Sequence, residues 1–175
     1  MTIILITGIP GVGKTTFIRK IADSLKELHP IGFYTQEIRE RGERVGFELI
    51  GFDGSSRLLA HINIRNQYRV GKYGVDITGF EEYLKTIALT KGEISPIIID
   101  EIGKMECFSP LFRDLITKLL ESDCLIIATI AKKGDHFIET IKRRGDVTLY
   151  EVTRENRDLL PSQVLEDIAT VQTSP

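Results

Sequence analysis

The chain has 175 residues, 42% of them hydrophobic, which is enough for one compact domain with a sizeable core and too few for two full domains. Its 23 Lys and Arg against 25 Asp and Glu give a formal net charge of -2, so no overall positive field attracts nucleic acid or an anionic membrane surface. We therefore expect a single domain over residues 1–175, a monomer or a weak oligomer, with neither a membrane nor a nucleic acid among its partners.

The two cysteines and the N-terminal segment indicate a cytoplasmic protein. Cys107 lies in a polar turn and Cys124 leads into an apolar run, and neither has neighbours at the spacing of metal ligands, so we interpret both as reduced thiols. The apolar run of residues 2–7 follows no basic leader and is far shorter than a signal core or a membrane span.

Short β-branched runs alternate with helical patterns along the chain. The expected elements are a strand at 2–7, a helix at 17–28, a strand at 96–100, a helix at 111–120, a strand at 125–130, a helix at 137–142 and a strand at 147–152. This alternation predicts a parallel sheet flanked by helices. Residues 3–6, 97–99 and 125–128 are continuously apolar, as in strands covered on both faces, so we expect them at the centre of the sheet.

Residues 31–62 interrupt this rhythm. Two strand-like runs, 32–39 and 44–52, flank Glu40-Arg41-Gly42-Glu43, whose glycine suits a tight hairpin connection. We therefore expect an antiparallel β insertion in an α/β fold whose central sheet is mainly parallel.

The first apolar strand runs directly into Gly8-Ile9-Pro10-Gly11-Val12-Gly13-Lys14-Thr15-Thr16, which fits the pattern G-x-x-x-x-G-K-[ST] and precedes an amphipathic segment. Glycines let backbone N–H groups approach phosphate oxygens, and the start of a helix adds unpaired N–H groups and a positive dipole end. Lys14 supplies a cation for the β and γ phosphates, and the Thr15 hydroxyl can ligate Mg²⁺. The segment therefore predicts a binding site for a nucleoside triphosphate.

A second segment, Ile97-Ile98-Ile99-Asp100-Glu101-Ile102-Gly103-Lys104, ends another apolar strand. Carboxylates at the C-terminal end of a central parallel strand face the same crevice as the phosphate loop. Asp100 is then in reach of Mg²⁺, and Glu101 can orient an attacking water or accept its proton. We assign nucleotide binding to both segments, catalytic roles to Lys14, Asp100 and Glu101, and metal binding to Thr15 and Asp100.

Two further polar residues allow two interpretations each. Lys104 either lies against the phosphates and neutralises charge that builds in the transition state, or is a solvated lysine in a turn. Thr129, at the end of the next apolar strand, either bonds the γ phosphate or the attacking water, or simply caps its strand.

Further blocks follow in the order Arg39–Phe47 in the hairpin, Val70–Tyr73, the carboxylate segment Asp100–Glu106 and Thr153–Arg157. With the phosphate loop, they resemble the cancer-related nucleoside triphosphatase family, which is also known from thermophilic microbes. The likeness runs from about residue 3 to residue 160. The phosphate loop alone is shared by a very large superfamily, whereas D-E-I-G-K-M-E with the arginine-glycine hairpin is much more specific.

The resemblance implies a three-layer, RecA-like P-loop fold. It also implies Mg²⁺-dependent hydrolysis of ATP, GTP and other nucleoside triphosphates to the diphosphate and phosphate, with loose base preference and slow turnover. Arg44, Lys72 and Tyr73 become candidates for contacts near the nucleotide. Tyr73 either stacks on a base or packs at the surface, and Asn156 and Arg157 either close over the base or cap the following segment.

Two other functions stay open. A small nucleoside or nucleotide kinase needs a second substrate pocket and an arginine-rich lid, and Lys132, Lys133, Arg143 and Arg144 either form such a lid or only solvate a surface. A nucleotide-gated switch would bind protein or RNA through the same basic segment and the β insertion, and a partner would stimulate its hydrolysis. An arginine finger can come from Arg44, from Arg143 or from a neighbouring chain.

Overall fold

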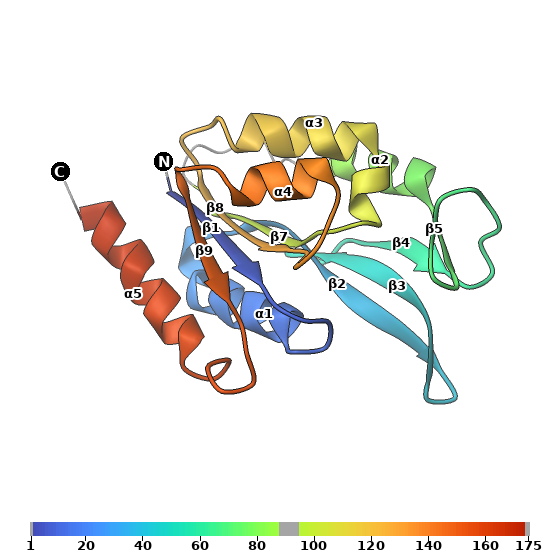
Figure 1. Ribbon diagram of the computed structural model, residues 1–175, viewed down its shortest axis with the longest axis horizontal. Coiled ribbons are helices and arrows are strands. Elements are labelled where there is room, and N and C mark those ends of the chain that lie inside the picture. Colours follow the sequence, from blue (N-terminus) through green and yellow to red (C-terminus); the bar gives the residue numbers. More distant parts are fainter. Residues whose placement is uncertain (1, 88–94, 174–175) are drawn as a thin grey trace.

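The computed structural model describes residues 2–87 and 95–173 (Figure 1). Its strands are β1 (Thr2–Thr7), β2 (Ile31–Glu40), β3 (Glu43–Gly51), β4 (Ser56–His61), β5 (Arg69–Val70), β6 (Tyr73–Val75), β7 (Ile97–Ile102), β8 (Leu125–Ile130) and β9 (Val147–Glu151). Its α-helices are α1 (Lys14–Ser24), α2 (Ile77–Thr86), α3 (Pro110–Leu119), α4 (His136–Lys142) and α5 (Leu160–Thr173), and η1 (Lys26–Leu28) and η2 (Glu106–Phe108) are short 3-10 helices.

The strands of the described residues form one mixed sheet in the order β5-β6-β4-β3-β2-β7-β8-β1-β9. The pairs from β2 through β7, β8 and β1 to β9 are parallel, and the pairs among β2 to β6 are antiparallel. The three continuously apolar runs lie in β7, β8 and β1, which are consecutive in the sheet. The predicted α/β fold with a mainly parallel centre and an antiparallel hairpin is confirmed.

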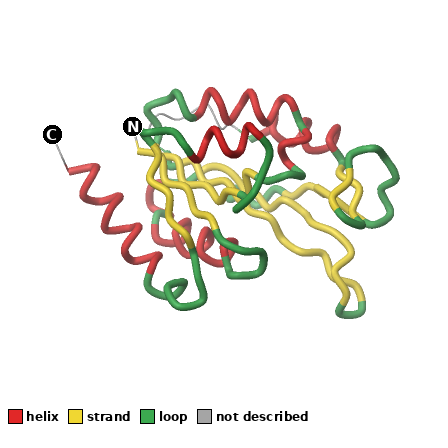
Figure 2. The backbone as a smooth tube through the Cα atoms, in the orientation of Figure 1, coloured by secondary structure: helices red, strands yellow, loops and turns green. Residues whose placement is uncertain are grey.

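Helices cover both faces of the sheet, which Figure 2 shows as the middle layer. Ile98 and Ile127 pack in one core cluster with residues of α1 and α5, whereas Ile97 and Ile126 pack in the other with residues of α2, α3 and α4. Each fully buried side chain of this kind contributes roughly 1.5–3 kcal/mol to the free energy of folding. Within the described part of the chain, no helix combines the length and the apolar character needed to cross a membrane.

The antiparallel segment differs from the expected insertion because it continues the central sheet. The first residues of β2, Ile31 to Phe33, pair in parallel with β7, and the rest of the strand pairs antiparallel with β3 out to Glu40. One long strand therefore belongs both to the parallel centre and to the hairpin, which projects beyond the body of the molecule in Figure 1. The sequence did not predict β4, β5, β6, α2 or α5 as separate elements.

Candidate active site

The loop between β1 and α1 is anchored on one side and open on the other. Gly13 has a φ of 110°, a left-handed conformation that suits glycine, and its carbonyl accepts the N–H of Phe17 at 2.9 Å as α1 begins. Val12 is 3% exposed and packs in the core with α1, whereas Ile9 is 49% exposed. The first turn of α1, whose N–H groups lack partners within the helix, thus starts beside an open loop where an anion can bind.

Lys14 and Glu101 meet beside this loop. The Lys14 ammonium lies 3.5 Å from a carboxylate oxygen of Glu101 and donates to the Gly8 carbonyl at 3.3 Å. The Lys14 side chain is 11% exposed and that of Glu101 is 31% exposed, so both remain accessible from one side. The cation and the carboxylate that the sequence selected from separate segments are therefore neighbours.

Asp100 is buried, with 1% of its surface exposed, and three threonines hold it. One carboxylate oxygen accepts the Thr15 hydroxyl at 2.6 Å and the Thr35 backbone N–H at 3.4 Å, and the other accepts the Thr129 hydroxyl at 2.5 Å. The Thr35 hydroxyl donates to the Asp100 carbonyl at 2.5 Å. These donors replace the water that a buried carboxylate loses. For Thr129 the contact is thus with Asp100, which the sequence did not anticipate.

Thr15 and Asp100 suit a magnesium ion. Hydroxyl and carboxylate oxygens are hard ligands, and here one of each lies 2.6 Å apart at the start of α1. Among the described residues no group of three or more His, Cys, Asp or Glu side chains could hold a metal. Magnesium at nucleotide sites normally takes one or two protein ligands and completes its shell with phosphate oxygens and water. The donor set therefore fits Mg²⁺ bound together with a nucleotide.

Two carboxyls near Asp100, those of Glu101 and Glu106, have raised pKa values. Burial raises the pKa of Glu101 and the Asp100 charge adds to the rise, while the Lys14 ammonium opposes it. Burial raises the pKa of Glu106 to about 8, and the charge of Glu101 adds to this rise. A Cβ on Gly103 would stand 3.0 Å from an oxygen of each carboxyl, so at most 6.0 Å separates these two oxygens. A side chain at this position would crowd both carboxyls.

Glu106 gives a pH-dependent stability that can be measured. As the pH rises from about 4.5 to about 8, the unfolded chain releases this proton while the folded chain keeps it, so the free energy of unfolding falls. Glu106→Gln removes this loss. We expect the stability difference between variant and wild type to shift in favour of the variant by about 4 kcal/mol between about pH 5 and about pH 8.5. Urea unfolding across this pH range measures the stability of both proteins. If the free energies of unfolding of the variant and the wild type changed with pH in parallel, the raised pKa of Glu106 would be contradicted.

The isoleucines of the carboxylate segment pack in the core, and Lys104 lies at the surface. Ile97, Ile98, Ile99 and Ile102 are at most 1% exposed and pack in the two core clusters. Their side chains offer no surface to a nucleotide, so we narrow their predicted role to holding Asp100 and Glu101 at the strand end. Lys104 is exposed and lines a cavity together with Cys107. Cys107, which we expected in a polar turn, is buried.

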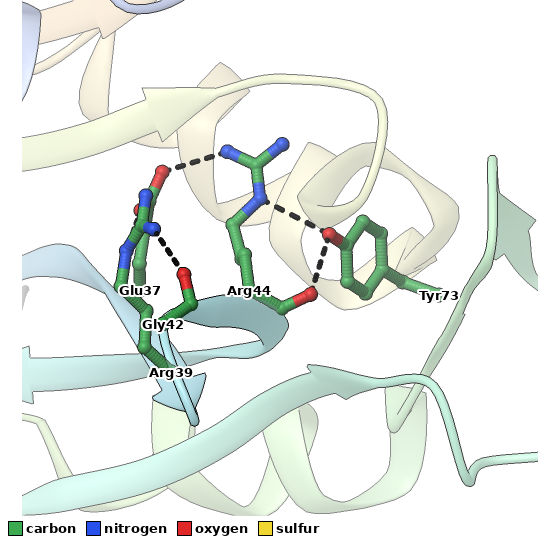
Figure 3. Close-up of polar contacts among 5 residues, drawn as sticks. All are labelled: Glu37, Arg39, Gly42, Arg44 and Tyr73. Carbon is green, nitrogen blue, oxygen red and sulfur yellow. Dashed lines mark hydrogen bonds and ion pairs between the residues drawn. The ribbon is translucent and has the colours of Figure 1, made fainter.

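Arg44 of the hairpin and Tyr73 of β6 belong to one polar cluster (Figure 3). The Arg44 guanidinium donates to the Tyr73 hydroxyl at 3.0 Å and to the Glu37 carboxylate at 2.7 Å. The Glu37 carboxylate also accepts a hydrogen bond from the Arg39 guanidinium. Arg44 and Lys72 both lie over the Tyr73 ring, 5.8 and 5.6 Å from its centre. Tyr73 is 8% exposed, so the contacts favour the packing role over stacking on a base.

Asn156 favours the capping interpretation as well. Its side-chain amide donates to the Glu151 carbonyl at 2.9 Å, and its oxygen accepts the Thr153 N–H at 2.8 Å. Both ends of the side chain therefore close the turn after β9. Arg157, one residue on, is exposed.

Three of the four basic residues proposed for a lid are tied to neighbours. Lys132 pairs with Glu151, Arg143 donates to the Glu139 carbonyl at 3.1 Å, and Arg144 pairs with Asp146 at 2.7 Å. These contacts favour the interpretation of a solvated surface.

Thr35 is a site residue that the sequence analysis missed. It bonds Asp100 twice, through its backbone N–H and its hydroxyl. No motif surrounds it, and its contact depends on β2 lying next to β7 in the sheet. Glu106 was visible at the end of the D-E-I-G-K-M-E motif, but only the fold shows that its carboxyl is buried near Glu101.

Comparisons with known proteins agree with this geometry. Residues 3–165 match a family model described as NTPase. The chain is 45% identical over 163 residues to nucleoside-triphosphatase THEP1 of Thermotoga sp. (strain RQ2), covering 93% of this chain and 92% of that one. It is 39% identical over 188 residues to the human cancer-related nucleoside-triphosphatase, covering 98% of this chain and 97% of that one. The crystal structure of THEP1 from Aquifex aeolicus superposes with a TM-score of 0.82 at 38% identity, covering 95% of this chain and 98% of that one.

Proposed function

This chain belongs to the NTPase family, and we propose that it hydrolyses ATP, GTP and other nucleoside triphosphates to the diphosphate and phosphate, with Mg²⁺, loose base preference and slow turnover. The observation that carries the proposal is the meeting of Lys14 and Glu101, 3.5 Å apart, at the open side of the phosphate loop. A phosphoryl group bound there would have a cation and a carboxylate within reach of the same atoms.

The chain's own residues would divide the work. The loop from Gly8 to Gly13 and the start of α1 would bind phosphate oxygens through backbone N–H groups. Lys14 would balance charge on the terminal phosphates, and Glu101 would hold the attacking water and take its proton. Thr15 and Asp100 would hold Mg²⁺, which supplies charge neutralisation at the β and γ phosphates. Thr35 and Thr129 would keep the Asp100 carboxylate oriented.

The proposal for Glu101 also has support from its surroundings. Burial and the Asp100 charge raise its pKa, so it holds a proton more readily than an exposed glutamate. A base of this kind accepts a proton from water more easily, provided that it is ionised when the nucleotide binds. The Lys14 ammonium, which lowers the pKa of Glu101, favours that ionised state.

A phosphate-release assay tests the function. We expect release from ATP, GTP, CTP and UTP at rates that differ by less than about tenfold, since the described residues show no base-reading contact. We also expect a loss of at least about hundredfold when EDTA removes Mg²⁺. Adding the metal back should restore the rate. Equal release with and without EDTA would overturn the metal assignment to Thr15 and Asp100.

The same assay separates the alternatives. Turnover that requires an added nucleoside or nucleotide acceptor would identify a kinase instead of a hydrolase. Stimulation by orders of magnitude on adding a protein or RNA partner would identify a nucleotide-gated switch, because a charge supplied in trans can be worth that much. Hydrolysis by the purified chain alone, without either addition, is the result that we expect.

We further propose that the protein works as a single domain in the cytoplasm, as a monomer or a weak oligomer. The near-neutral charge balance and the two free cysteines, one buried and one half-buried, support this proposal. Sedimentation at micromolar concentration, with and without nucleotide, measures the oligomeric state.

A further inference from the structure

A second cavity lies beside the carboxylate segment. It has a volume of about 340 Å³, within the range of small-molecule sites. Its lining residues come from the turn after β7, η2, α3, the β8–α4 loop and α4. The residues that matter below are Lys104, Cys107, Phe108, Arg113, Lys133 and Ile138. The roles proposed above for nucleotide hydrolysis use none of these six residues.

This cavity is on the other side of the sheet from the phosphate loop. Asp100 contacts Thr15 of α1 and continues the row of Ile98, which packs in the cluster of α1 and α5. Cys107 and Ile138 pack in the opposite cluster, with α2, α3 and α4. The Glu101 charge nevertheless reaches Cys107, where it contributes to raising the pKa of the thiol. The cavity therefore adjoins the proposed catalytic carboxylate without being part of the phosphate site.

The polar side of the cavity carries excess positive charge. Arg113 is neutralised by Asp135 at 2.5 Å, and its guanidinium is fixed further by the Cys107 carbonyl at 2.6 Å. Lys104 and Lys133 also line the cavity, and neither ammonium has a hydrogen-bond or ion-pair partner among residues 2–87 and 95–173. Two uncompensated cations at one cavity favour an anionic ligand.

The remaining wall is apolar. Ile138 is 1% exposed, and Phe108 lies with its ring centre 5.6 Å from that of Tyr68, which fixes its position. Burial and the neighbouring Glu106 charge raise the pKa of Cys107 to about 12, so its thiol stays neutral and presents an apolar surface. A bare inorganic ion would leave this wall without a partner, whereas a ligand with an organic part would cover it.

We propose that this cavity binds a small organic anion, with its phosphate or carboxylate group at Lys104 and Lys133 and its apolar part against Phe108 and Ile138. The site is additional to nucleotide hydrolysis and does not depend on it. It places a second small molecule next to Glu101 while a nucleotide occupies the phosphate loop.

Fluorine NMR with 4-fluorophenyl phosphate tests this proposal. The probe is titrated into the full chain with saturating Mg²⁺ and a non-hydrolysable ATP analogue, so that the phosphate loop is already filled. We expect saturable line broadening with the wild type and about tenfold weaker binding to Lys133→Glu, which reverses one of the two free charges. Lys118→Glu makes the same change at an exposed position of α3 outside the cavity, and it should bind as the wild type does.

Further arms identify the ligand chemistry. Neutral 4-fluorobenzyl alcohol should show no saturable binding, and tighter binding of 4-fluorobenzoate than of the phosphate would support the site with a carboxylate as its anionic group. Equal affinity of wild type and Lys133→Glu would overturn the proposal, as would displacement of the probe by the ATP analogue. Because the readout is binding, a chain that failed to hydrolyse nucleotides would still give a clear result.

Discussion

Replacing Glu101 by glutamine is expected to reduce phosphate release by at least about hundredfold while leaving nucleotide affinity nearly unchanged. Glutamine keeps the size of the side chain but cannot take a proton from water. The Lys14 ammonium, 3.5 Å from the Glu101 carboxylate in the wild type, would lose its counterion and stay available to phosphate. The effect should therefore fall on turnover and not on binding.

Two measurements separate these effects. Calorimetry with a non-hydrolysable analogue gives the affinity, and single-turnover phosphate release gives the chemical step. Glu121→Gln makes the same substitution at an exposed position after α3 and should leave both unchanged. Undiminished phosphate release by Glu101→Gln would remove this residue from the proposed mechanism.

Replacing Lys14 by alanine should weaken nucleotide binding by about tenfold or more and also slow turnover by about hundredfold. The ammonium would contact the phosphates before and during the reaction, so its loss affects both steps. Its removal also raises the pKa of Glu101 further, because the Lys14 charge is the main influence that lowers it. Less of the proposed base would then be ionised at neutral pH.

A second lysine of α1 provides the control. Lys20 is exposed on the same helix, and Lys20→Ala should match the wild type in affinity and in turnover. Thermal unfolding of both variants checks that they are folded. A Lys14→Ala protein that bound and hydrolysed nucleotide normally would contradict the assignment of the phosphate loop.

The local parts of the fold and the site could be predicted because their signals are contiguous in the sequence. The loop from Gly8 to Thr15 combines strand, glycines and helix start in one stretch, and the continuous apolar runs of β1, β7 and β8 indicated strands covered on both faces. The hairpin turn at residues 41–42 was marked by its glycine. These features need no knowledge of distant contacts.

The missed parts depend on contacts between distant segments. Strands β5 and β6 have two and three residues, too few for a periodic pattern. They form because β6 pairs with β4 and β5 pairs with β6. The Thr35 contact with Asp100 exists because β2 and β7 are neighbours in the sheet, and predicting it requires the strand order. Tyr73 was a candidate for a base contact, but its partner Arg44 covers it only once β3 and β6 are brought together.

Strand β2 is long enough to reach from the candidate active site to the tip of the hairpin. The strand bonds Asp100 through Thr35 and ends at the hairpin tip at Glu40, with unbroken backbone between them. The same strand therefore forms one arm of the projecting hairpin and supplies two of the hydrogen bonds that orient Asp100.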